Sequence, residues 1–195
     1  MIKAILFDAD GVTLIKQGYL SEKLSRDFNI PLDQIMPFFR NDYRLCQEDK
    51  LDLKIILPKY LEQWKIQKSV DDFLDYWFSA DTKPDKIMIE KIQTLRTNGI
   101  KCYLASDQEK YRAEYILHTL KFSEYFDKCF FSYNVGSSKS NPNFFKKVLE
   151  ELKLNPDEVV YFDDDQKNIE VAKLVGINDQ YFTNINDMEY VAGNK

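Results

Sequence analysis

The amino-acid sequence predicts an α/β fold in which helices cover both faces of a parallel sheet. Three observations support this prediction. Short apolar runs that do not alternate with polar residues recur along the chain, as expected for strands buried on both faces. Segments with helical spacing of apolar residues lie between these runs, which favours right-handed strand–helix–strand crossovers. A long segment near the N-terminus has helical spacing only, which indicates a helical insertion.

Five strands are expected, and each of the first four ends at a polar residue. In chain order they cover residues 2–7, 100–105, 129–131, 159–162 and 180–182, of which the fifth has the weakest pattern. With the strands numbered along the chain, we expect a doubly wound, Rossmann-like sheet in the order 5-4-1-2-3.

Helices are expected at residues 86–98, 108–120, 142–152 and 168–175. The pair Asn141–Pro142 is typical of a helix N-terminus. Gly99 and Gly176 follow two of these segments, as glycines do at helix C-termini.

The insertion follows the first strand directly and shows no strand alternation. Apolar residues recur there at four-residue intervals, as in Leu20, Leu24 and Phe28. We therefore expect two domains: an α/β core made of residues 1–15 and 84–195, and an all-helical domain over residues 16–83. Trp64 and Trp77 are expected in the core of the helical domain.

Acidic and hydroxyl side chains follow three of the predicted strands, as Asp8 and Asp10, as Ser106 and Asp107, and as the run 163–165. A single such group is commonly a polar turn, but ligands bind beyond the carboxyl ends of parallel strands, where these groups meet. Crowded carboxylates repel unless a cation compensates them, and Mg²⁺ prefers a few carboxylates together with water. The pattern therefore predicts a Mg²⁺ site, and Mg²⁺ points to a phosphate group on the substrate.

The composition argues against several classes of partner. The chain carries 27 Lys and Arg against 32 Asp and Glu, so a dense basic face for nucleic acid is not expected. Its apolar runs are too short to cross a membrane. Its three cysteines form no metal or disulfide pattern, so we expect a cytoplasmic protein. The single histidine, His118, is expected to be structural. Whether the protein is a monomer or a homodimer is left open.

Four segments carry a family resemblance. In chain order, LFDADGV, LASDQ, GSSKSNPNFF and VVYFDDDQKNIEVAKLVGI resemble the four motifs of the haloacid dehalogenase superfamily. The helical insertion lies between the first two motifs, where this family places its first (C1) type of cap. Within the family, the motifs are most similar to the sugar-phosphatase and epoxide-hydrolase N-terminal phosphatase branches.

The resemblance implies a role for each motif residue. Asp8 would be the nucleophile that accepts the phosphoryl group as an aspartyl phosphate, and Asp10 the general acid and then base. Ser106 would donate a hydrogen bond to a phosphate oxygen. Lys139 would neutralise the charge of the nucleophile and the phosphoryl group.

The same resemblance implies the ligands of a Mg²⁺ cofactor. They would be Asp8, the backbone carbonyl of Asp10, and Asp164, with Asp163 either a ligand or the partner of a bound water. The implied function is a Mg²⁺-dependent phosphatase for a small phosphorylated metabolite, with sugar phosphates as one class. Dehalogenases generally lack an equivalent of Asp10. Open alternatives are a phosphomutase on the same scaffold, a receiver-like phospho-acceptor switch without turnover, and an inactive, binding-only homologue.

Two positions depart from the family pattern. Lys139 is followed by Ser140 where proline is common, and Ser106 by Asp107 where asparagine is frequent. The role of Asp107 is left open. In the insertion, Arg40 and Arg44 are spaced to grip a polar substrate, but a solvated charged face is the favoured interpretation.

Overall fold

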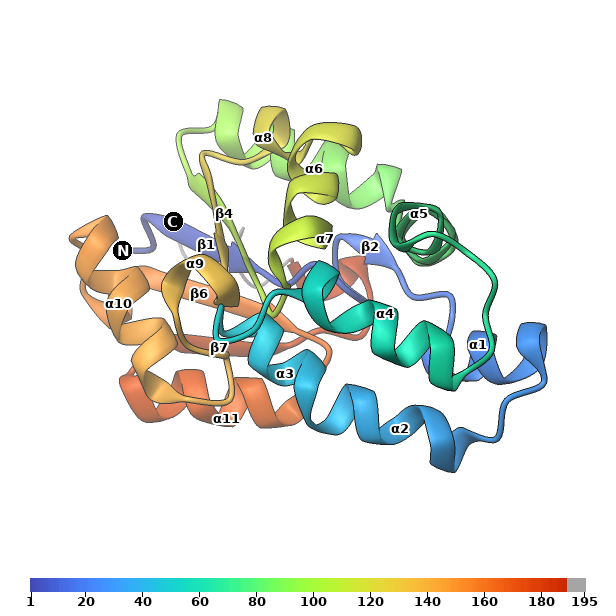
Figure 1. Ribbon diagram of the computed structural model, residues 1–195. Helices are drawn as coiled ribbons and strands as arrows, with labels where there is room; N and C mark the ends of the chain where they lie inside the picture. Colours follow the sequence, from blue (N-terminus) through green and yellow to red (C-terminus); the bar gives the residue numbers. More distant parts are fainter. Residues whose placement is uncertain (189–195) are drawn as a thin grey trace.

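The computed structural model describes residues 1–188, and a five-stranded parallel sheet forms its centre (Figure 1). The strands lie in the order β5 (Lys128–Phe131), β4 (Lys101–Ser106), β1 (Ala4–Phe7), β6 (Val159–Asp163) and β7 (Asn178–Tyr181). The predicted order 5-4-1-2-3 is thereby confirmed. Phe7, the last residue of the central strand, pairs in parallel with Leu104 on one side and with Phe162 on the other. The carboxyl ends of the three middle strands therefore lie at the same edge of the sheet.

Alternate side chains of the buried strands pack against helices on opposite faces of the sheet. Ile5 and Phe7 lie in one core, which includes residues of α6 (Lys86–Thr97) and α8 (Phe122–Tyr125). Ala4 and Leu6 lie in the other core, which includes residues of α10 (Pro142–Leu152) and α11 (Gln166–Val175). Because both faces of β1 are buried, its sequence has no polar alternation. The doubly wound fold class is thus confirmed.

The helical insertion follows β1, and two short strands join its ends. Leu14–Ile15 (β2) pairs antiparallel with Lys83–Pro84 (β3). Between them lie α1 (Leu20–Phe28), α2 (Leu32–Arg40), α3 (Asp42–Gln47), α4 (Leu53–Gln63) and α5 (Val70–Asp81). These helices have an aromatic core of their own, in which Phe38, Trp64, Phe73 and Trp77 are buried. The expected core positions of Trp64 and Trp77 are confirmed.

The structure corrects the predicted elements in several places. β7 begins at Asn178 and ends at Tyr181, two residues and one residue before the predicted limits, because polar residues form most of this edge strand. The predicted helix 108–120 is instead α7 (Lys110–Glu114) followed by a π-helical turn (Tyr115–Thr119). α11 begins two residues early because the Asp165 side chain caps it by accepting from the Lys167 N–H.

The short helices α9 (Ser132–Val135) and Pro156–Glu158 were not predicted, nor was α8. A further short helical turn covers Ile185–Met188. Within residues 1–188, no helix combines the length and the apolar character needed to cross a bilayer.

Candidate active site

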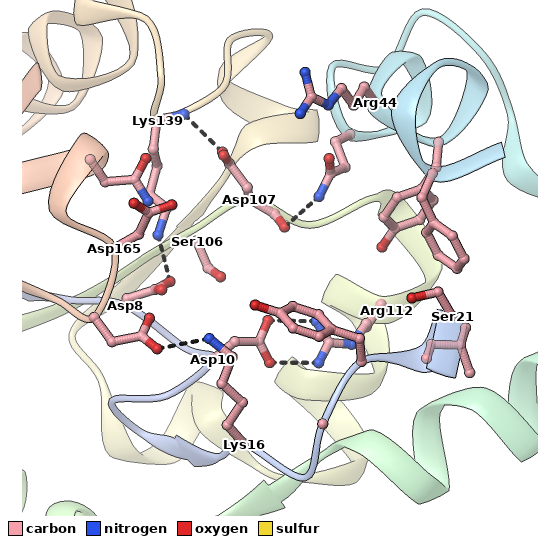
Figure 2. A pocket seen from close by; sticks show the side chains of 18 of the residues that line it. Asp8, Asp10, Lys16, Ser21, Arg44, Ser106, Asp107, Arg112, Lys139 and Asp165 are labelled. Carbon is pink, nitrogen blue, oxygen red and sulfur yellow. Dashed lines mark hydrogen bonds and ion pairs between the residues drawn. The ribbon is translucent and has the colours of Figure 1, made fainter. Parts of the chain in front are cut away.

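A cavity of about 510 Å³ opens at the carboxyl end of the sheet, between the α/β core and the helical insertion (Figure 2). Core residues that line it include five of the six predicted site residues. The insertion contributes an aromatic wall and one arginine. The core set is Asp8, Asp10, Ser106, Lys139 and Asp164, and the insertion set includes Tyr19, Phe39, Tyr43, Trp77 and Arg44. The sixth predicted residue, Asp163, is fully buried at the end of β6, does not line the cavity, and contacts Lys139.

Asp8 follows β1 directly and its side chain is nearly buried. Its backbone N–H donates to the Phe162 carbonyl at 2.9 Å, which continues the sheet ladder one residue beyond the strand. Its Oδ1 accepts from the Ala9 N–H at 2.7 Å and lies 2.7 Å from Nζ of Lys139. Within the described part of the chain, these partners bind Oδ1, which leaves Oδ2 for a substrate or a metal.

Lys139 brings a buried positive charge to two carboxylates. It is 2% exposed, and its Nζ lies 2.7 Å from Asp8 Oδ1 and 2.8 Å from Asp163 Oδ2. Burial lowers the pKa of Lys139, but the charges of Asp8 and Asp163 outweigh burial and hold this pKa well above its ordinary value. Lys139 therefore remains charged inside the site.

The pKa of Asp8 is raised well above its ordinary value. Burial is the main cause, and the nearby charges of Asp163 and Asp10 add to it, while Lys139 opposes them. A divalent cation bound beside Asp8 would oppose this shift and favour the ionised carboxylate.

Asp163, the last residue of β6, has no exposed surface and is fully engaged by its neighbours. Its Oδ2 accepts from Lys139 Nζ, from the Tyr161 hydroxyl and from Asn168 Nδ2, and its Oδ1 accepts from the Asp165 N–H. These contacts fix the carboxylate that orients Lys139. Asp163 is thus suited to hold Lys139 in place.

Three carboxylates lie close enough together to bind one divalent cation. One oxygen from each of Asp8, Asp163 and Asp164 can be chosen so that all three lie within 4.8 Å of one another. Oxygen ligands of this kind suit Mg²⁺. Lys16, from the start of the insertion, donates to Asp164 Oδ2 at 2.9 Å and partly balances the charge of the group (Figure 2). The donor set therefore fits the predicted cofactor.

Gly11 makes the approach of Asp164 to the first motif possible. Its φ is +87°, a conformation that side chains disfavour, and an added Cβ would lie 2.5 Å from Cγ of Asp164. Only glycine leaves room for this carboxylate beside the Asp8–Asp10 turn.

Replacing Gly11 by alanine is expected to weaken Mg²⁺ binding as well as folding. The added methyl group displaces Asp164, so activity should require a higher Mg²⁺ concentration for half-saturation. Gly99→Ala is the matched control, because Gly99 has a φ of +86° and no atom within 4 Å of an added Cβ. Both variants should lose about 1–2 kcal/mol through the backbone conformation. An unchanged Mg²⁺ requirement in Gly11→Ala, measured by titrating activity, would contradict this account.

Asp10 is held by two residues that the sequence analysis did not identify. Arg112 donates to both of its oxygens, from one terminal nitrogen at 2.8 Å and from the other at 2.7 Å. Gln108 Nε2 donates to Asp10 Oδ2 at 2.8 Å. Burial raises the pKa of Asp10, but the charge of Arg112 and these hydrogen bonds outweigh burial and lower the pKa.

Asp107, whose role the sequence left open, restrains the loop that carries Lys139 by a hydrogen bond to its backbone. Its Oδ1 accepts from the Lys139 backbone N–H at 2.8 Å, and its carbonyl accepts from Gln47 of the insertion at 2.8 Å (Figure 2). Burial raises the pKa of Asp107, although the charge of Lys139 opposes this effect. The hydrogen bond to the Lys139 N–H restrains a loop in which Ser140 stands in place of proline.

The insertion supplies one of its two candidate arginines to the cavity. Arg44 lines the cavity, whereas Arg40 does not line it and is exposed at the end of α2. The two side chains therefore do not line the cavity together, as the less favoured of the two interpretations required. His118 is exposed on the π-helical turn and is also absent from the lining.

Arg112 and Gln108 escaped prediction because their part in the site depends on where α7 begins. A signal was nevertheless present: the two residues are spaced i, i+4 directly after the strand that ends in Ser106. On the predicted helix 108–120 this spacing places both side chains on one face, although in the structure Gln108 precedes α7 and reaches Asp10 from the loop. Lys16 had no comparable signal, since its contact joins residues 148 positions apart.

A model of the family described as haloacid dehalogenase-like hydrolase matches residues 2–176. The phosphorylated carbohydrates phosphatase of Thermotoga maritima is 26% identical over 187 residues, which span 92% of this chain and 84% of the relative. The bifunctional epoxide hydrolase 2 of Sus scrofa is 25% identical over 207 residues, which span 90% of this chain and 35% of that protein.

The fold is also similar to that of a solved enzyme from Bacteroides thetaiotaomicron, crystallised with magnesium and inorganic phosphate. The TM-score is 0.82 at 21% identity, and the match covers 98% of this chain and 99% of the other. This likeness extends over the α/β sheet and the helical insertion.

Proposed function

The chain belongs to the haloacid dehalogenase-like hydrolases, and we propose that it is a Mg²⁺-dependent phosphatase that acts through an aspartyl phosphate. The observation that carries the proposal is the position of Asp10, a second carboxylate at the same cavity as Asp8 and Lys139. A group that moves protons to an ester oxygen is useful in phosphoryl transfer. The names of the relatives, a phosphatase for phosphorylated carbohydrates among them, agree with this choice.

In the first step, Asp8 Oδ2 attacks phosphorus and the bond from phosphorus to the ester oxygen breaks. Asp10 donates a proton to the departing oxygen, so the product leaves as an alcohol. The negative charge of an arriving phosphate opposes the effect of Arg112 on Asp10 and favours the protonated form that donation requires. Ser106 and Lys139 bind the phosphoryl oxygens.

In the second step, Asp10 accepts a proton from the water that attacks the aspartyl phosphate. The bond between phosphorus and the Asp8 oxygen breaks, which releases inorganic phosphate and regenerates the carboxylate. Asp8, Asp164 and the Asp10 carbonyl would hold Mg²⁺, with Asp163 nearby, and the bound ion would supply positive charge to stabilise the transferred phosphoryl group.

We assign substrate selection to the helical insertion, which we treat as a cap domain over residues 16–83 on a core of residues 1–15 and 84–195. A cavity of about 510 Å³ suits a small metabolite. Its aromatic wall offers surface for the apolar face of a sugar ring, and Arg44 and Gln47 offer hydrogen-bond donors. Sugar phosphates are therefore the class to examine first.

A screen of phosphorylated metabolites with Mg²⁺ tests this function. We expect many turnovers, with one free phosphate released for each alcohol formed, and no activity when the metal is removed with EDTA. Isomerised product without free phosphate would indicate a phosphomutase. A single phosphate bound per chain without turnover would indicate a phospho-acceptor switch. Metal-independent turnover would contradict the proposed cofactor.

A further inference from the structure

We propose that Arg112 and Gln108 are positioning residues that fix the orientation of the Asp10 carboxylate relative to the Ser106 hydroxyl. The inference rests on the proposed function, since it concerns the groups assigned there to proton transfer and phosphate binding. It adds two residues whose side chains act through Asp10 and Ser106.

Arg112 is nearly buried and binds Asp10 at two points, while the Asp10 side chain stays 38% exposed toward the cavity. Arg112 is 5% exposed, and its two terminal nitrogens reach separate oxygens of the carboxylate at 2.8 and 2.7 Å. A planar guanidinium bound at two points fixes the rotation of a carboxylate as well as its position. A lysine at this position keeps the charge but binds at one point.

Gln108 connects the carboxylate to the hydroxyl. It is 1% exposed, its Oε1 accepts from Arg112 at 2.6 Å, and its Nε2 donates to Asp10 Oδ2 at 2.8 Å and to Ser106 Oγ at 3.0 Å. Because arginine can only donate, the amide oxygen must face Arg112 and the amide nitrogen must face the other two groups. The three hydrogen bonds therefore permit only one orientation of the Gln108 side-chain amide.

This orientation has a consequence for Ser106. Its Oγ accepts the hydrogen bond from Gln108, so the hydroxyl hydrogen is directed to another acceptor. A phosphate oxygen beside Asp8 is such an acceptor. Gln108 thus prepares Ser106 as a donor while it orients the carboxylate that moves the proton.

The segment that carries both residues is anchored on two sides. Glu109 caps α7 by accepting from the N–H groups of Tyr111 and Arg112 at 2.8 and 2.7 Å. The Tyr111 hydroxyl donates to Asp52 of the insertion at 2.9 Å. These contacts restrain the backbone from which Arg112 and Gln108 reach the site. Small displacements of catalytic groups are costly, so this support bears directly on rate.

The test compares leaving groups in the Arg112→Lys variant. Single-turnover release is measured with Mg²⁺ for para-nitrophenyl phosphate, whose leaving group needs little protonation, and for the best alkyl phosphate from the screen. If Arg112 positions Asp10, the variant should lose about 10- to 100-fold more rate on the alkyl ester than on the aryl ester. Gln108→Met, which cannot donate to Asp10, should shift the ratio in the same direction and serves if Arg112→Lys does not fold.

Arg96→Lys is the matched control for the loss of a structural arginine. Arg96 binds Asp127 and two backbone carbonyls outside the cavity, so its variant should keep the wild-type ratio of the two rates. Equal losses on both esters in Arg112→Lys and Gln108→Met would overturn the positioning role while leaving the proposed function intact. A wild-type chain that hydrolyses neither ester would overturn both.

Discussion

Asp8→Asn is expected to abolish turnover while the protein remains folded. The amide keeps the shape of the side chain and can still accept hydrogen bonds through one oxygen, but it is a poor nucleophile toward phosphorus. Lys139 keeps its second partner, Asp163, at 2.8 Å. Removing a covalent nucleophile costs on the order of 10⁴- to 10⁶-fold in kcat, and we expect a loss in that range.

The measurement is phosphate release under saturating substrate and Mg²⁺, with circular dichroism and urea unfolding to establish the fold. Asp71→Asn is a suitable control, because Asp71 is exposed on the insertion and pairs with Lys54 away from the cavity. The control should retain wild-type activity. Full activity in Asp8→Asn would remove Asp8 as the nucleophile.

Lys139→Met is expected to lower both activity and stability. The substitution leaves Asp8 and Asp163 buried beside each other without the ammonium group that separates them. Breaking a buried ion pair on one side costs about 3–5 kcal/mol of unfolding free energy. Loss of a charge that stabilises the transition state costs a further factor of about 10²–10³ in kcat.

Urea unfolding and steady-state kinetics measure the two effects separately. Lys101→Met is the matched control: the Lys101 side chain is 62% exposed and pairs with Asp127 on the surface. Such a surface pair contributes little, so the control should change stability by less than about 1 kcal/mol and leave kcat unchanged. A Lys139→Met protein with the stability of the control would contradict the buried ion-pair assignment.

The sequence predicted the fold well where burial shaped its pattern. β1 and β6 are apolar because both faces are covered, and their carboxyl ends carry the acids that meet in the cavity. Parallel pairing of β1 with β4 and β6 then brings Asp8, Ser106 and Asp163 to one edge, although they are far apart in sequence. Topology alone therefore places these three predicted residues.

Other features have no strong local pattern. The strands β2 and β3 contain two residues each, which is too short for periodicity. In the edge strand β7, Asn178, Asp179 and Gln180 have side chains that suit a turn equally well. The contact between Arg112 and Asp10 depends on the start of α7, which the Glu109 side chain determines through capping. Such contacts depend on the tertiary structure and leave no strong pattern in the spacing of residues along the sequence.

The central claim is that Asp8 carries the phosphoryl group during turnover. The most direct test is an acid quench of the enzyme turning over substrate with Mg²⁺, followed by mass spectrometry of its peptides. We predict a phosphoryl group on Asp8 in the wild-type protein and none in Asp8→Asn. Sustained turnover with no phosphoryl group on Asp8, or with the group on another residue, would contradict the account.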